Sequence, residues 1–421
     1  MDKTRVVITG VGVVAPNGIG KDEFWSNCFA GVSGIKPITL FDVSRYRCHY
    51  AGEVSDFQPE HYLGPKGLRN LDRTTLLALV AAKLAIEDAH LEITDENRND
   101  IGVVLGSTMG SVHSISEFDR TGLREGPRYV NPALFPNAVI NSPASQVAIR
   151  FGLRGLNSTI STGFSASLDA IGYAMDMLTL GRARTLLVGG VEELCIETFL
   201  GFYKLGFLIR SFNGGPIRLM PFHPQCAGTL LGEGAVFCVM ETLERAEERG
   251  ATIYAELLGY GTQFSPALMY HYDPSGEAAA AAMRISLEDA GVTPGEIHRI
   301  SACANAVKDW DTMEAAAIQA VFGPGAPASI SAVKSLLGES FSAGGAFQLA
   351  EAVGVLINHA VLAIAHRGHL VPAGHHESIQ PGHHSMQSSD PDAHPNLALI
   401  DSFGPTGVSS ALVIGGAHQA N

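Results

Sequence analysis

Apolar residues recur along the chain in two patterns, each typical of one kind of secondary structure. Continuous apolar runs such as RVVITGVGVVAPNG (residues 5–18) and IGVVLG (101–106) lead into glycine-rich turns and predict buried strands. In TTLLALVAAKLAIEDAH (74–90) the apolar positions repeat at helical spacing, which predicts an amphipathic helix. A proline-rich connection and a second helix, ASQVAIRF, follow within residues 131–151. Strands and helices therefore alternate over the first part of the chain.

The order of these segments recurs further along the chain. The helical segment AAKLAIEDA (81–89) resembles AAMRISLEDA (281–290), and a predicted strand follows each of them. Residues 147–162 and 317–333 also resemble each other, because in both a helix leads to Phe-Gly, a loop and a β-branched strand. Each match is weak, but the matches keep their order. The sequence therefore predicts an internal duplication.

We expect two similar halves, an N-terminal half of residues 1–250 and a C-terminal half of residues 251–421. Alternating strands and helices of these lengths predict right-handed crossovers and a mostly parallel sheet that is buried on both faces. Two such halves packed together give an α/β protein with the layers α/β/α/β/α. Polar residues interrupt the longest apolar segment, about residues 346–365, which predicts a core helix and not a membrane span.

Composition and charge restrict the kind of partner. The 421 residues are 46% hydrophobic and 17% charged and include 47 glycines, which suits a large α/β core with tight turns. The net charge of −14 argues against nucleic-acid and anionic-membrane partners, because no basic patch is available to neutralise phosphates. The six cysteines are scattered without a disulfide or CxxC pattern, and the N-terminus lacks a signal-peptide apolar region. We expect reduced thiols and a cytoplasmic location.

The segment NSTISTGFSASLDAIGYA (157–174) is the main candidate for chemistry. It predicts a β-branched strand, a tight turn of small residues and the start of an amphipathic helix. Such an elbow places one side chain at a helix N-terminus, where N–H groups and the helix dipole stabilise negative charge. Acyl-transfer enzymes place a Cys or Ser nucleophile there. Here the residue at the tip is Phe164, which cannot act as a nucleophile.

Several short motifs, taken in order over essentially the whole chain, resemble the β-ketoacyl synthase branch of the thiolase fold. They are RVVITGVGVVAPNGIGKDEFW, GSTMGS, the elbow, LLVGGVEE, PFHPQCAGTLLGEGAVFCVMETLERAEERGA, KSLLGE and DSFGPTGVSSALV. The resemblance implies a thiolase fold with duplicated βαβαβαββ halves. It also implies chemistry on an acyl chain held by a phosphopantetheinyl acyl carrier protein, with no cofactor and no metal.

The same resemblance identifies the positions that carry catalysis in the family. Phe164 stands where the family has its acyl-accepting Cys, and Cys303 and Glu339 stand at the positions of its two His residues. The glycine-rich gate, which usually reads Asn-Ser-Phe-Gly-Phe-Gly-Gly, begins here with Asp401 and has Pro405 in place of the gating Phe. Lys334 is retained, and we expect it to form a salt bridge with Glu339. No catalytic residue is therefore expected in this chain.

Loss of the catalytic positions on a preserved scaffold resembles the chain-length factor, or ketosynthase β subunit, of type II polyketide synthases. This resemblance implies a heterodimer with an active ketosynthase, a role in shaping the acyl tunnel of a polyketide or polyene pathway, and an acyl carrier protein as a further partner. The segment from Met109 to Phe135 matches the part of ketosynthases at the dimer interface and tunnel. Its apolar candidates for limiting chain length are Met109, Val112, Ile115, Phe118 and Phe135.

The sequence leaves two alternative functions open. The chain could be a β-ketoacyl synthase that uses an unusual nucleophile, with Ser161, Ser165 and Cys303 as candidates. It could instead be a homodimeric protein that binds acyl chains or acyl carrier proteins. Phe164 either plugs a dead pocket or gates the site of the partner, and a packing role is favoured for Cys303. We expect the histidine-rich segment 374–394 to be a polar surface loop and not a metal site.

Overall fold

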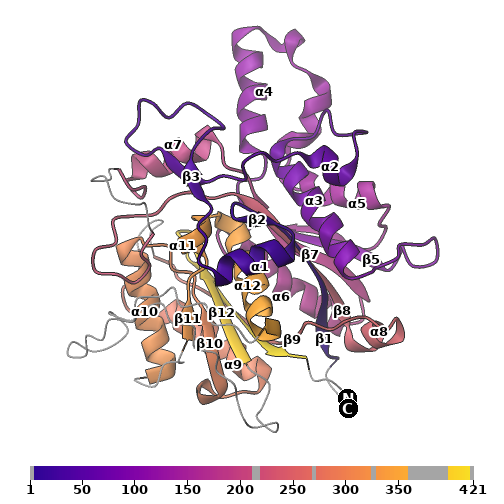
Figure 1. The fold of residues 1–421 in the computed structure, drawn as a ribbon, viewed down its shortest axis with the longest axis vertical. Helices are drawn as coiled ribbons and strands as arrows, with labels where there is room; N and C mark the ends of the chain where they lie inside the picture. The colour runs from indigo at the N-terminus through magenta and orange to yellow at the C-terminus, as the bar shows by residue number, and fades with distance from the viewer. Residues whose placement is uncertain (1–3, 211–218, 268–271, 324–328, 359–396, 418–421) are drawn as a thin grey trace.

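A large twisted sheet forms the centre of the molecule (Figure 1). The computed structural model describes residues 4–210, 219–267, 272–323, 329–358 and 397–417. At the middle of the sheet, β1 (Val6–Ala15) pairs antiparallel with both β8 (Gly234–Thr242) and β9 (Ala255–Phe264). The other strands of this sheet are β2 (Gly18–Ile19), β5 (Ile101–Gly106), β6 (Asn157–Ile160), β7 (Thr185–Glu192), β10 (Ile297–Ser301), β11 (Ser329–Ser331), β12 (Leu397–Phe403) and β13 (Val408–Gly416).

The two halves of the sheet have the same strand order and the same strand directions. Outward from the centre, the first half reads β1-β8-β7-β5-β6 and the second reads β9-β13-β12-β10-β11. This correspondence is the structural form of the sequence repeat, although the boundary at residue 250 stays a prediction. The expectation of a mostly parallel sheet is wrong. Among the described strands, only β5 and β10 pair in parallel with both of their neighbours, and the other pairs of this sheet are antiparallel.

Helices cover both faces of the sheet and fill the space between its halves. The outer helix α3 (Arg73–Asp88) packs on β1 and β8, and on the other side α9 (Glu277–Ala290) packs on β9 and β13, with α10 (Lys308–Phe322) against α9. Between the halves lie α6 (Ala166–Thr179) and α12 (Gly344–Asn358). The molecule therefore has the predicted α/β/α/β/α layers.

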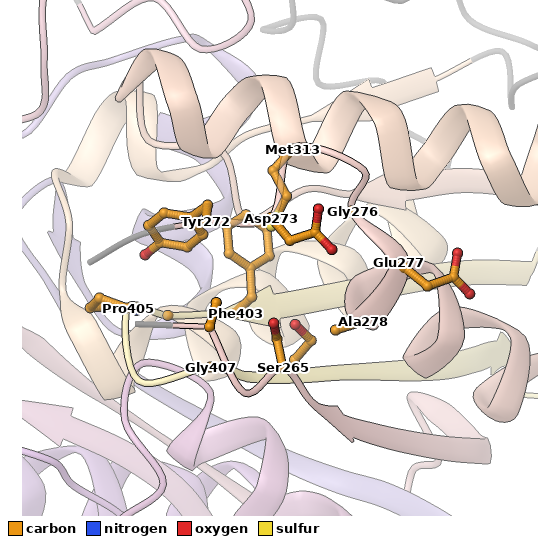
Figure 2. A pocket seen from close by; sticks show the side chains of 13 residues that line it. Ser265, Tyr272, Asp273, Gly276, Glu277, Ala278, Met313, Phe403, Pro405 and Gly407 are labelled. Carbon is orange, nitrogen blue, oxygen red and sulfur yellow. The ribbon is translucent and has the colours of Figure 1, made fainter. Parts of the chain in front are cut away.

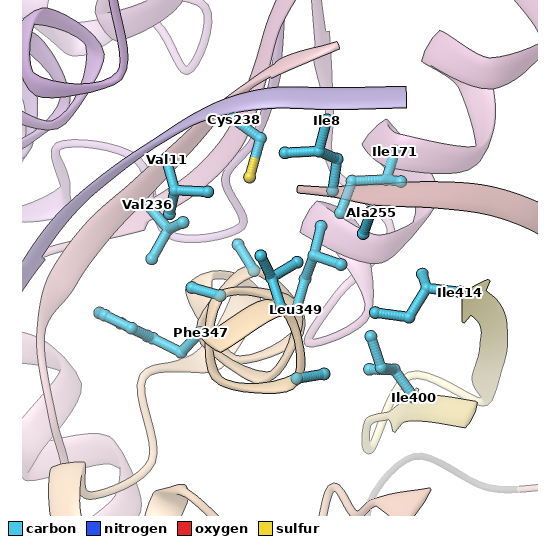
Figure 3. Close-up of a cluster of buried hydrophobic side chains, with 14 of the residues drawn as sticks. Ile8, Val11, Ile171, Val236, Cys238, Ala255, Phe347, Leu349, Ile400 and Ile414 are labelled. Carbon is cyan, nitrogen blue, oxygen red and sulfur yellow. The ribbon is translucent and has the colours of Figure 1, made fainter. Parts of the chain in front are cut away.

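The α12 helix is the centre of the largest apolar core. Figure 3 shows this helix surrounded by side chains from both halves, including Ile8 and Ile400, with Phe347 and Leu349 from the helix itself. Each of these four side chains is at most 1% exposed. The predicted core helix is confirmed as far as Asn358, and the rest of the predicted segment lies outside the described residues.

The α4 helix (Val112–Arg124) extends away from the body of the molecule (Figure 1). None of its residues is fully buried, and Leu123 is 87% exposed. The short elements η1 (Pro127–Tyr129) and η2 (Pro132–Ala138) lie beside it. Among the described residues, no helix is both long and apolar enough to cross a membrane.

The remaining elements are short or lie at the surface. A separate two-stranded sheet consists of β3 (Ile35–Pro37) and β4 (Tyr50–Gly52). The other helices are α1 (Lys21–Phe29), α2 (Pro59–Leu63), α5 (Ser142–Phe151), α7 (Ile196–Leu205), α8 (Leu243–Glu248), α11 (Lys334–Leu337), η3 (Pro294–Glu296) and η5 (Phe341–Ala343).

Candidate functional site

The elbow predicted from the sequence is present between β6 and α6. Strand β6 ends at Ile160 and helix α6 begins at Ala166, so the turn between them contains five residues. Gly163 has a φ of +93°, a backbone conformation that residues with a side chain rarely adopt. Its carbonyl accepts a hydrogen bond from Thr108 Oγ1 at 2.5 Å. This turn leaves Phe164 directly before the helix N-terminus, where the candidate nucleophile position was expected.

The Phe164 side chain is enclosed by other aromatic rings and is 2% exposed. Its ring centroid lies 5.2 Å from that of Phe341, 5.8 Å from Trp310 and 6.0 Å from Phe202. Such spacings and tilted geometries are favourable for aromatic pairs. Phe341 has a φ of +50°, a conformation that costs a non-glycine residue about 1–3 kcal/mol and persists only when its surroundings enforce it. Aromatic side chains therefore fill the space in front of the elbow.

The loop between β12 and β13 closes the elbow from the other side. Thr406 Oγ1 donates to the carbonyl of Thr162 at 3.3 Å, and Ser402 Oγ donates to the carbonyl of Phe164 at 3.4 Å. The contact is so close that a Cβ atom at Gly404 would lie 2.8 Å from Phe164 Cβ. The loop can approach Phe164 this closely only because residue 404 is glycine.

A small pocket lies next to this loop, between the end of β9 and the start of α9 (Figure 2). Pro405, Phe403, Met313 and Tyr272 form part of its wall, and the Phe403 ring contacts the Tyr272 ring. Phe403 also belongs to the buried cluster that contains Phe164. The pocket is therefore next to the closed elbow, and Phe403 forms the wall between the two regions.

Lys334 and Glu339 form a fully buried ion pair, as the sequence predicts. Lys334 Nζ lies 3.0 Å from Glu339 Oε2, and each side chain is 1% exposed. Glu339 Oε2 also accepts a hydrogen bond from Asn305 Nδ2 at 2.7 Å, and Glu339 Oε1 accepts one from the Phe341 amide at 2.9 Å. The carboxylate that stands at a predicted His position is therefore fully hydrogen-bonded.

Cys303 lies against the same lysine, with Lys334 Nζ donating to its sulfur at 3.2 Å. Burial raises the pKa of the Cys303 thiol to about 11, although the ammonium group of Lys334 favours the thiolate. For Lys334 itself, burial alone would lower the pKa, but Cys303 and Glu339 outweigh that effect and raise it. At neutral pH Lys334 is therefore charged and the Cys303 thiol is neutral.

A second buried acid pair, Glu314 and Asp401, lies behind Cys303. The Cys303 amide donates to Glu314 Oε1 at 2.8 Å and to Asp401 Oδ1 at 3.2 Å. Burial and the nearby acidic groups raise the pKa of Glu314 well above its usual range, and burial raises that of Asp401 to about 6. Both carboxyl groups accept from the Cys303 amide, so a proton on one of them relieves their mutual repulsion, and the stronger pKa shift favours Glu314 as the protonated residue.

Next to the elbow, the carboxylate of Asp169 in α6 is surrounded by hydroxyl groups. It accepts hydrogen bonds from Ser165 Oγ at 3.1 Å and from Tyr260 OH at 2.6 Å, and also from the hydroxyls of Thr162 and Ser410. Ser165 is 0% exposed. Its hydroxyl therefore points into the protein and towards Asp169, and not towards an acyl donor.

Family models match both halves of the sequence. The model of the β-ketoacyl synthase N-terminal domain matches residues 3–246, and the model of the β-ketoacyl synthase C-terminal domain matches residues 254–367. The chain belongs to the β-ketoacyl synthase family. Synthases of this family need no cofactor of their own, and an acyl carrier protein carries their substrate.

Two curated relatives of this chain are named as synthases. The 3-oxoacyl-[acyl-carrier-protein] synthase 2 of Coxiella burnetii is 36% identical over 350 residues, which cover 83% of this chain and 84% of the relative. The enzyme of the same name from Staphylococcus aureus strain N315 is 33% identical over 345 residues, covering 82% of this chain and 83% of the relative.

Solved structures in the family include assemblies of type II polyketide synthases. The structure titled the ishigamide ketosynthase/chain length factor matches with a TM-score of 0.84 and 29% identity, covering 99% of this chain and 100% of that one. A second structure contains AntDE with the carrier protein AntF, described as a type II acyl-carrier protein in complex with its ketosynthase. It matches with a TM-score of 0.84 and 27% identity, covering 99% and 100% of the two chains.

The predicted tunnel residues of this β-ketoacyl synthase family member do not form one cluster with the elbow. Met109 packs against the apolar cluster that contains Phe164. Val112, Ile115 and Phe118 lie on the projecting α4 helix, and Phe135 of η2, which is 58% exposed, contacts the Phe118 ring at 5.8 Å. Within this chain, α4 and η2 therefore present these side chains at the periphery.

Sequence reasoning missed several residues that define the site. Phe202, Trp310 and Phe341 come from three segments far from Phe164 in the sequence, and no spacing links them to it. Asn305 lies 34 residues before Glu339, whose carboxylate it contacts. Glu192 and Glu193 end the motif LLVGGVEE, and the sequence alone predicts no separate role for them. Of these, Glu192 accepts hydrogen bonds from the Thr108 and Met109 amides and so fixes the loop in front of the elbow.

Proposed function

We propose that this chain is a catalytically inactive, ketosynthase-like subunit of the chain-length-factor kind. It would form a heterodimer with an active β-ketoacyl-[acyl-carrier-protein] synthase and shape the acyl tunnel in type II polyketide or polyene biosynthesis. The observation that carries the proposal is the enclosed Phe164 ring at the elbow. A residue without a nucleophilic atom, in a space filled by other rings, leaves no acceptor for an acyl group.

The surrounding groups support the same proposal. Cys303 holds a neutral thiol at neutral pH, and the thiolate is the form that accepts acyl groups. The amide of Asn305 and the ammonium group of Lys334 are both engaged by Glu339. A donor that is already bound to a buried carboxylate is not available to stabilise enolate charge on a substrate. The site retains the architecture of the family without groups that can perform its chemistry.

The projecting α4 region supports a role that depends on a partner. Leu123, Tyr129 and Phe135 are 87%, 63% and 58% exposed, and they come from α4, η1 and η2, which lie together. Among the described strands, β6 lies at the end of the sheet and pairs with β5 alone. Exposed apolar side chains and a free sheet edge are each typical of surfaces that another chain covers. An active ketosynthase is the partner that we propose for this surface.

The alternative function is that of a β-ketoacyl synthase with a non-standard nucleophile. The names of the curated relatives favour it, because they are 3-oxoacyl-[acyl-carrier-protein] synthases. Of the candidate nucleophiles, Ser165 and Cys303 are buried, whereas Ser161 is exposed. A covalent acyl adduct on any of these residues would establish the alternative.

Co-expression with an active type II ketosynthase tests the proposal. We expect a stable one-to-one complex on size exclusion, and we expect Leu123→Asp together with Phe135→Asp to prevent it. Leu180→Asp is the matched control, because Leu180 is 67% exposed at the C-terminal end of α6. A soluble homodimer that never retains the ketosynthase would instead support the acyl-binding alternative and contradict the proposal.

A further inference from the structure

Three side chains that can bind a metal ion meet where α4 contacts α7. They are His113 and Glu117 of α4 and Glu197 of α7, and each offers one ligand atom within 4.8 Å of the others. His113 Nδ1 lies 3.1 Å from Glu197 Oε2. These residues lie outside the elbow, and the proposed function does not use them.

The local structure brings these ligands together in a regular way. His113 and Glu117 are four residues apart on α4, so their side chains lie on the same face of the helix one turn apart. Glu197 lies in the first turn of α7, facing them. The His113 amide donates to the buried Glu193 Oε1 at 3.2 Å, which anchors the start of α4. The ligand atoms are therefore positioned by two helices and not by a loop.

The charges at this junction suit a cation. The Glu197 side chain is 20% exposed, and its Oε2 faces the His113 ring nitrogen Nδ1 at 3.1 Å. Glu197 Oε1 is a buried oxygen for which no hydrogen-bond donor is present in the described part of the chain. Arg120 Nη2 lies 3.9 Å from Glu197 Oε1, beyond hydrogen-bond distance. Within the described residues, one oxygen of Glu197 is therefore buried without a hydrogen-bond donor.

We propose that His113, Glu117 and Glu197 form a site for a divalent transition-metal ion such as Zn²⁺. One imidazole nitrogen and two carboxylate oxygens match the ligands that this ion prefers, with water completing the coordination. Imidazole favours Zn²⁺ over Mg²⁺ and Ca²⁺, which prefer oxygen ligands alone. The bound ion would clamp α4, which buries none of its own residues fully, onto α7.

Arg120 is the competitor for this site. Its guanidinium group forms an ion pair with Glu117 and lies near Glu197, so it neutralises part of the charge that a metal ion would neutralise. Its side chain is 43% exposed and can move into solvent when an ion binds. Removing its charge should therefore strengthen metal binding, whereas a site that is only an ion-pair network predicts no such gain.

The experiment is a ZnCl₂ titration of the full chain by calorimetry, with hydrogen exchange measured over residues 112–124 and 196–205. The segment 374–394 contains further histidines, so every variant carries alanine at all of them: His375, His376, His383, His384 and His394. In this background we expect His113→Ala and Glu197→Gln each to weaken Zn²⁺ binding by about 10–100-fold or more. Loss of a residue that only orients a metal ligand already weakens binding by about that factor, and these two residues are the ligands themselves. We expect Arg120→Gln to strengthen it. His61→Ala, at an exposed histidine of α2, is the matched control.

Hydrogen exchange in α4 and α7 and the calorimetric binding of Zn²⁺ together test the metal site. If the proposal holds, Zn²⁺ slows exchange in α4 and α7, and His113→Ala abolishes this protection while His61→Ala keeps it. MgCl₂ at the same concentration should leave exchange unchanged. Zn²⁺ binding that is absent once the 374–394 histidines are removed, or protection that survives His113→Ala, would overturn the proposal.

Discussion

At the residue scale, the buried Lys334–Glu339 pair gives the sharpest expectation for stability. Glu339→Gln would leave the lysine ammonium group in the interior without its counter-charge, because both side chains are 1% exposed. Breaking a buried pair in this way costs about 3–5 kcal/mol. Urea unfolding of Glu339→Gln should show a loss of this size. The double variant Lys334→Met/Glu339→Gln should recover part of it, and a double variant that is less stable than Glu339→Gln would contradict this account.

Asp401 provides a pH dependence with a defined sign. Folding raises its pKa from about 3.9 to about 6, so between these values the folded protein binds more protons than the unfolded chain. The free energy of unfolding should therefore fall as pH rises from about 4 to 6 and stay reduced above that range. Asp401→Asn, which restores the residue usual in the family, removes this charge and can still accept the Cys303 amide hydrogen bond.

We therefore expect Asp401→Asn to be more stable than the original protein at pH 8, by up to about 3 kcal/mol for a shift of about two pKa units. The difference should shrink towards pH 4. Chemical denaturation at both pH values measures it. An advantage for Asp401→Asn that grows on acidification would show that the sign of the pKa shift is wrong.

At the scale of elements, α6 is connected to β9 through the Tyr260 hydroxyl on Asp169. Burial and the neighbouring Asp169 raise the pKa of Tyr260, so the phenol remains a neutral donor. Tyr260→Phe keeps the ring that packs against Gly172 and removes only this hydrogen bond to a carboxylate. We expect a loss of about 1.5–3 kcal/mol in urea unfolding. Tyr129→Phe, at a tyrosine that is 63% exposed, should change stability little, and equal effects of the two variants would argue against the connection.

Element type and order could be predicted from the sequence where local patterns decide them. The apolar run at 101–106 coincides with β5 (Ile101–Gly106), and the helical pattern at 74–90 corresponds to α3 (Arg73–Asp88). Strand direction could not be predicted, because pairing depends on which distant segments meet. The strands β12 and β13 form a hairpin through the short loop at 404–407 and pair antiparallel, whereas the alternation with helices suggested parallel neighbours.

The candidate site could be predicted only in part. The elbow and the Lys334–Glu339 pair follow from residues that lie close together in the sequence or in a single motif. The enclosure of Phe164 does not, because α7, α10 and η5 each contribute one ring and come from segments far apart along the chain. Packing around a buried residue depends on tertiary structure, which periodicity does not encode.

At the scale of the whole molecule, the projecting α4 region is where this chain would limit the length of the product made by the proposed heterodimer. Phe118 of α4 and Phe135 of η2 are in ring contact at 5.8 Å, and both are candidates for closing the acyl tunnel. We expect Phe118→Ala or Phe135→Ala to lengthen the products of the partner ketosynthase, because a smaller side chain leaves room for further extension. Product masses from the reconstituted complex measure this. Unchanged products from an intact dimer would remove these residues from the tunnel, and Leu180→Ala is the control.

The central claim is that this chain cannot accept an acyl group. The most direct measurement is the mass of the intact purified protein after incubation with acyl-loaded carrier protein, with an active 3-oxoacyl-[acyl-carrier-protein] synthase as the positive control. We predict an unchanged mass for this chain, because Phe164 fills the elbow and the Cys303 thiol is neutral and buried. A mass increase of one acyl group, mapped to Ser161, Ser165 or Cys303, would contradict the account.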